Sequence, residues 1–214
     1  MCAALGYALR VVRALPLLSL GLSGLSWAGC TAGEMTTHPT VVLDPDFSAA
    51  EVAQIRAGLE SWERKGPAVT FTIDVASDHS SFAQDAESRP APNTVYMLRE
   101  REHLCAFAYT APTPVAPIAF TIRNANGSSV TCLDADRLDA AESGQPNVFK
   151  AVAAHEMGHS FGLVHDDIGV ATGMPESIMT TYHQDEPADG EVTCVDARGV
   201  EAHFGGQLPA ACAK

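Results

Sequence analysis

Basic residues are scarce in this sequence: 13 lysines and arginines stand against 26 aspartates and glutamates, and the formal net charge is −13 at pH 7. Proteins that bind nucleic acids or anionic membrane surfaces do so through clusters of Lys and Arg. The shortage of such residues argues against both kinds of partner. We interpret the acidity as a means of keeping an extracellular protein in solution.

The chain also lacks any Cys-x-x-Cys pair, internal repeat or low-complexity tract, so zinc bound by cysteines is not expected. Its 214 residues, 46% of them apolar, suit a single domain with a sizeable core. Four of the six cysteines lie in the body of the chain. In an exported domain they predict two disulfides with three alternative pairings, and proximity along the chain favours Cys105–Cys132 and Cys194–Cys212.

Acidic residues are missing from the first 29 residues, which carry Arg10 and Arg13 before an apolar run over 14–27. A basic start followed by a short apolar stretch predicts a secretory signal peptide rather than a membrane-spanning helix. Small residues then precede Cys30, which resembles the bacterial lipoprotein box, whose cysteine is acylated after cleavage. Trp27 stands where that box usually has Leu, so plain secretion and an uncleaved anchor are alternatives that the intact mass of the exported protein distinguishes. Cleavage removes two of the 13 basic and none of the 26 acidic residues, so the net charge becomes −15.

Residues 30–39 are small and polar and predict a tether, so the folded domain is expected over 40–214. Apolar alternation between turn residues predicts strands at 40–43, 69–75, 94–98, 118–123 and 129–133. Helical spacing and capping residues predict helices over 49–64, from Pro146 or Asn147 through His159, and about 194–204 with Thr193 as its cap. We interpret 76–92 as a polar surface loop with a solvated His79. This order predicts an α/β domain with a mostly parallel, twisted sheet.

One stretch combines His155-Glu156-x-x-His159 with Gly162 and His165. Positions four apart lie on the same face of a helix, so His155 and His159 can aim ring nitrogens at one point. Gly162 can adopt a positive φ that ends the helix, which lets His165 return toward that point. Three imidazoles with an open fourth position suit a catalytic zinc that keeps a water molecule.

Together with the downstream Ser177-Ile178-Met179-Thr180, this stretch resembles the metzincin zinc endopeptidases. The resemblance extends over about 40–204, although its specific motifs lie within 155–182. The residues from His155 to Leu163 are most similar to the matrixin branch, whereas Asp166 is more similar to the adamalysin branch, so the branch stays open. The resemblance implies a twisted, mostly parallel sheet with an active-site helix and a C-terminal helix.

The resemblance also assigns roles to residues. His155, His159 and His165 would bind one zinc ion, and Glu156 would act as general base for the attack of water on a peptide carbonyl. Met179 would form the Met-turn, an apolar floor beneath the zinc. Tyr182 is a candidate for oxyanion or ligand support, although astacin-like and serralysin-like members place this tyrosine two residues after the Met and not three.

The resemblance further implies an extended protein or peptide substrate along the strand at 118–123, with the loop 167–176 lining the main pocket. We expect a monomer that contacts a membrane only through a lipid on Cys30. Two other functions stay open: a non-proteolytic surface lipoprotein that keeps the zinc site for binding, and a zinc hydrolase of a non-peptide amide. A structural zinc is disfavoured because it would not need Glu156.

The stretch 134–142 is interpreted as an acidic loop, and it contains Asp134, Asp136, Asp139 and Glu142. Calcium is an alternative cofactor here, but the spacing fits no EF-hand loop. Four carboxylates in so short a stretch are typical of a solvated face. Calcium is therefore unsupported.

Overall fold

A computed structural model describes residues 35–99, 105, 118–142, 147–165, 177–180 and 189–213. The predicted signal peptide, Cys30, Asp166, the loop 167–176 and Tyr182 lie outside the described residues. The chain divides into two units, 1–31 and 32–214, and the described residues all belong to the second. Among them, no helix has the length and apolar character needed to cross a membrane.

A five-stranded sheet forms the centre of this unit, in the order β2-β1-β3-β5-β4. The strands are β1 (Thr40–Leu43), β2 (Thr72–Val75), β3 (Thr94–Leu98), β4 (Ala119–Arg123) and β5 (Ser129–Leu133). All neighbours run parallel except β4, which pairs antiparallel with β5 at one edge. The predicted mostly parallel sheet is confirmed. β2 is shorter than the predicted 69–75 because it is the opposite edge strand, and its one partner, β1, has four residues that pair with Thr72–Val75.

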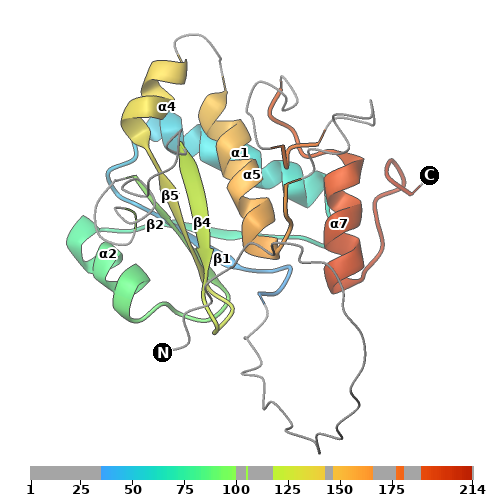
Figure 1. The fold of residues 1–214 in the computed structure, drawn as a ribbon, viewed down its shortest axis with the longest axis horizontal. Helices are drawn as coiled ribbons and strands as arrows, with labels where there is room; N and C mark the ends of the chain where they lie inside the picture. Colours follow the sequence, from blue (N-terminus) through green and yellow to red (C-terminus); the bar gives the residue numbers. More distant parts are fainter. Residues whose placement is uncertain are drawn as a thin grey trace, which may run out of the picture. The chain divides into compact units, whose positions relative to one another are not determined.

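Two helices cover one face of the sheet, α1 (Ala49–Lys65) and α5 (Val148–Phe161) (Figure 1). Val95 and Met97 of β3 point to this face, and they belong to the same buried cluster as residues of both helices. The α1 residue Trp62 is fully buried and its Nε1 donates to Ala154 O at 2.8 Å. Because that bond joins α1 to the backbone of α5, it fixes the helix on which the histidines lie.

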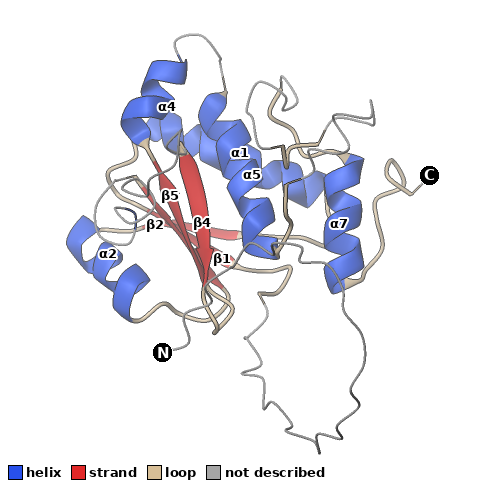
Figure 2. Cartoon of the chain, viewed as in Figure 1, coloured by secondary structure: helices blue, strands red, loops and turns tan. Residues whose placement is uncertain are grey.

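The other face is covered by α2 (His79–Ser88), which corrects the predicted loop over 76–92 (Figure 2). Asp78 caps this helix by accepting from Ser81 N at 2.7 Å. Phe82 and Ala86, one turn apart, are buried against Tyr96 and other residues of β3 and β5. The helix was missed because only this narrow face is apolar, so its overall composition is that of a loop.

The acidic stretch is also a helix and not a loop: α4 spans Ala135–Glu142. Asp134, which is fully buried, precedes it, and its backbone carbonyl accepts from Leu138 N at 2.9 Å. Leu138 is buried beneath the helix, and Asp139 forms an ion pair with Arg99 at 3.1 Å. Asp139 therefore has a structural partner, and in the described part of the chain none of these carboxylates joins a cluster suited to a metal ion.

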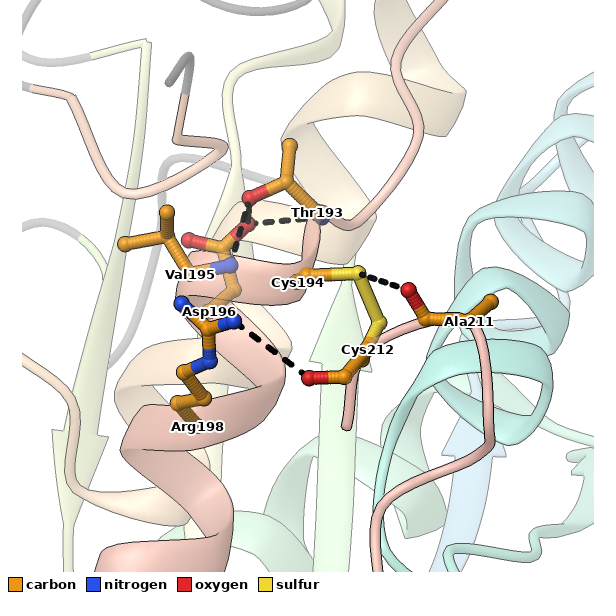
Figure 3. The surroundings of a disulfide bond; sticks show 7 residues. All are labelled: Thr193, Cys194, Val195, Asp196, Arg198, Ala211 and Cys212. Atoms are coloured by element: carbon orange, nitrogen blue, oxygen red, sulfur yellow. Dashed lines mark hydrogen bonds between the residues drawn. A yellow bond between two sulfur atoms is a disulfide. The ribbon is translucent and has the colours of Figure 1, made fainter. Parts of the chain in front are cut away.

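The last helix, α7 (Cys194–Phe204), begins at the predicted cap Thr193. Disulfides join Cys105 to Cys132 and Cys194 to Cys212, the two pairs that proximity in the sequence favours. Figure 3 shows the second bond tying the C-terminal segment to the first turn of α7. Arg198 Nη2 also donates to Cys212 O at 3.4 Å, so this segment is fixed where α7 begins.

Candidate metal centre

The helix α5 carries His155, Glu156 and His159 and ends at Gly162, as the sequence predicts. Gly162 has a φ of 98°, and its N–H and that of Leu163 bond back to carbonyls of the last helical turn. This left-handed conformation reverses the chain. Glycine is suited to it because any side chain at this position would be strained. The reversal brings His165 back beside the helix.

The Nε2 atoms of the three histidines form a nearly equilateral triangle. The Nε2–Nε2 distance is 3.1 Å between His155 and His159, 3.2 Å between His155 and His165, and 3.1 Å between His159 and His165. A tetrahedral zinc with Zn–N distances of about 2.0–2.1 Å separates its nitrogen ligands by about 3.3 Å. The donor set and its spacing therefore fit zinc.

Two backbone carbonyls orient the helical histidines. His155 Nδ1 donates to Ile178 O at 2.7 Å, and His159 Nδ1 donates to Leu163 O at 2.9 Å. A proton on Nδ1 leaves the Nε2 lone pair directed at the centre of the triangle. Burial, followed by the neighbouring His155, lowers the pKa of His159 to about 4, so this imidazole is neutral at pH 7, the form that binds metals.

Glu156 lies next to the triangle and is only 4% exposed. Its Oε2 accepts from Thr121 Oγ1 of β4 at 2.7 Å, and Thr121 Oγ1 lies 2.9 Å from Thr131 Oγ1 of β5. Neither threonine stands out in the sequence, because both fall in ordinary strand patterns. The carboxylate thus extends from α5 toward the edge of the sheet.

Met179 packs directly beneath the helix, and it is 2% exposed. A Cβ at Gly158 would collide with Met179 Sδ, so the thioether needs a glycine at that position. The adjacent Ile178 supplies the carbonyl for His155, which links this segment to the triangle. Met179 is therefore a buried residue packed against α5, and its role as the Met-turn stays a prediction.

A buried carboxylate that sequence reasoning missed, Asp196 in the first turn of α7, holds this segment in place. Its oxygens accept from Ser177 Oγ at 2.6 Å, Ile178 N at 3.2 Å and Thr193 N at 2.8 Å. Asp196 also completes the capping box of α7 with Thr193, and the spacing Thr193-x-x-Asp196 was the signal that could have revealed it. A chain of contacts therefore runs from α7 through Ile178 to His155.

Replacing Asp196 with alanine should lower both stability and zinc affinity. The change leaves buried donors without an acceptor, so we expect the free energy of unfolding to fall by about 3 kcal/mol. Because Ile178 O loses its support, the affinity for zinc should fall roughly tenfold or more. Urea unfolding and chelator competition measure these effects, with the exposed Asp85→Ala as control. Wild-type zinc affinity in Asp196→Ala would contradict the coupling.

A cavity of about 360 Å³ opens between the end of α5, Met179 and α7. Leu163, Val164, Val195 and Ala202 contribute to its mainly apolar lining. It lies close to the histidine triangle, because its lining includes Leu163, whose carbonyl accepts from His159 Nδ1, and Val164, which precedes His165. An apolar side chain of a ligand at the triangle has space here.

A second group of metal-type side chains, Asp44, Asp46 and His79, lies where β1 meets α2. His79 Nδ1 donates to Asp44 Oδ1 at 2.9 Å, and Asp44 Oδ2 accepts from Arg99 N at 3.0 Å. These bonds account for the arrangement as a structural tie between the β1–α1 connection and α2. They also correct the prediction that His79 is a solvated loop residue, since its side chain is 27% exposed.

Comparison with known proteins identifies one family. The sequence model of the matrixin family matches residues 41–205, which include the whole sheet apart from the first residue of β1, and the helices α1, α2, α4, α5 and α7. No curated protein matches the chain.

Proposed function

Because the chain belongs to the matrixin family of zinc metallopeptidases, we propose that it is an endopeptidase in which His155, His159 and His165 hold the zinc ion and Glu156 is the general base. The observation that carries this proposal is the triangle of three Nε2 atoms beside a buried carboxylate. A structural zinc site would fill its fourth position with protein and would not require the carboxylate.

In this mechanism the residues of the chain hold the metal, orient the groups that bind it and transfer protons. Zinc, when bound, supplies a Lewis acid that polarises the peptide carbonyl and acidifies water. Glu156 takes the proton of the attacking water and passes it to the nitrogen of the leaving amine, so that an amine and not an amide anion departs. The neutral tautomers of His155 and His159, fixed by Ile178 O and Leu163 O, keep the nitrogen lone pairs available.

The proposed substrate is an extended segment of protein or peptide that pairs with β4. This strand is at the edge of the sheet, antiparallel to β5, so its outer backbone groups face no further strand among the described residues. Pairing of the substrate with β4 would supply main-chain hydrogen bonds, with specificity from side-chain pockets. The cavity beside Leu163 and Met179 is suited to an apolar side chain of that substrate.

Digestion of an unstructured protein such as casein tests the proposal. We expect internal cleavage, loss of cleavage on addition of a zinc chelator, and recovery when zinc is restored, because the three histidines hold the ion reversibly. Mass spectrometry of the products separates internal cleavage from removal of terminal residues. Absence of cleavage by a zinc-loaded protein, with retention of zinc, would favour the non-proteolytic alternative.

A further inference from the structure

The hydroxyl of Thr121 reaches the Glu156 carboxylate from the sheet. Thr121 lies at the middle of β4, and its Oγ1 donates to Glu156 Oε2 at 2.7 Å. Glu156 is 4% exposed, so this bond forms in a largely water-free environment. Hydrogen bonds to ionised groups are shorter and stronger than neutral ones, and a low dielectric strengthens them further.

A second threonine sets the direction of this hydroxyl. Thr131 of β5 is the register partner of Thr121, and their Oγ1 atoms are 2.9 Å apart. A hydroxyl has only one proton, so a Thr121 that donates to Glu156 must accept from Thr131. Thr131 is fully buried, and donation to Thr121 gives its hydroxyl a partner. The result is a series of hydrogen bonds from Thr131 of β5 through Thr121 of β4 to the Glu156 carboxylate.

The contact also couples two parts of the proposed enzyme. Alternate residues of β4 face α5: the partly buried Ala119 packs against the buried cluster on that side, Thr121 reaches Glu156, and the Arg123 guanidinium lies against Gly162. The same strand is the proposed edge for substrate pairing. The carboxylate is thereby fixed relative to the strand that would align the scissile bond.

We propose that Thr121 is a positioning residue that sets the orientation of the Glu156 carboxylate, with Thr131 directing the Thr121 hydroxyl. The inference rests on the proposed function, in which Glu156 is the base. The terminal torsion of a glutamate is broad and roughly two-fold, so an unsupported carboxylate samples many orientations. Small misplacements of a catalytic group can cost up to roughly a hundredfold in rate.

The test compares Thr121→Val, which removes the hydroxyl and keeps the shape, with Thr121→Ser, which keeps the hydroxyl. Thr121→Val should lower kcat roughly 10- to 100-fold with KM within about twofold, whereas Thr121→Ser retains most of kcat. Thr131→Val should give a smaller loss, because Thr121 keeps its hydroxyl but loses the donor that directs it. Thr72→Val, the same change on the opposite edge strand, is the matched control.

Crystal structures of the zinc-loaded wild type and Thr121→Val provide a readout that does not depend on turnover. We expect equal zinc content and a rotated Glu156 carboxylate in the variant. An unchanged carboxylate, a wild-type kcat, or an equal loss in Thr121→Ser would overturn the proposal. If the wild type cleaves no peptide, the proposed function fails, but these structures still decide the role of Thr121. If Thr121→Val does not fold, the orientation of the Glu156 carboxylate is compared between the wild type and Thr131→Val instead.

Discussion

Replacing Glu156 with alanine is expected to abolish peptide hydrolysis while the protein keeps its zinc. A positioned general base contributes roughly 10²- to 10⁴-fold to a rate, so kcat should fall by that amount. Glu156 is the one acid within the helical motif and lies beside the histidine triangle without belonging to it. Zinc per chain and kcat, measured on the same preparation, separate loss of the base from loss of the metal.

Glu156→Gln is the companion variant, because its amide oxygen can still accept from Thr121 and the side chain keeps its volume. It should be folded, zinc-loaded and similarly inactive. The control is Glu60→Ala, since Glu60 is exposed on α1 and makes none of the contacts described for the site. Wild-type turnover by either Glu156 variant would rule out this carboxylate as the base.

Replacing His159 with alanine is expected to remove both zinc and activity. The change leaves two imidazoles of the triangle, and even the loss of a group that only supports a ligand lowers metal affinity 10- to 100-fold in typical sites. Loss of a ligand itself should therefore lower zinc affinity by more than roughly a hundredfold. Competition with a chromophoric chelator measures the affinity, and peptide cleavage is assayed in parallel.

The control for this variant is His38→Ala. His38 is exposed and bonds to Thr70 at 2.8 Å, far along the chain from the motif, so zinc affinity should stay at the wild-type level. Circular dichroism distinguishes loss of zinc from loss of the fold. A His159→Ala protein that is folded and still binds zinc tightly would show that the triangle is not the metal site.

The arrangement of the histidines could be predicted because it is local. His155 and His159 are one helical turn apart, and Gly162 ends the helix, so two short-range rules are enough to bring His165 alongside. The same is true of the capping boxes that start α1 and α7. In each case the interacting residues lie within a few positions of one another, and backbone geometry alone fixes their separation.

The helices α2 and α4 were not predicted, although both carry local signals. In α2, Asp78 is a good cap and Phe82 and Ala86 share a face, but the remaining residues are polar. In α4, Ala135 and Leu138 are buried, whereas the run of acidic residues gives the stretch a polar composition. A helix that touches the domain through one narrow face leaves little apolar periodicity, so composition favoured a loop.

The sequence by itself determined the triangle of histidines, the helix that carries it and the order of the five strands and of α1, α5 and α7 along the chain, because these follow from spacing along a regular backbone. Only the tertiary structure decided what supports the site. Thr121 is 35 residues from Glu156, and Asp196 is 18 residues from Ile178. Whether such pairs meet depends on the register of β4 against β5 and on how α5 and α7 pack, and no local spacing rule encodes those arrangements.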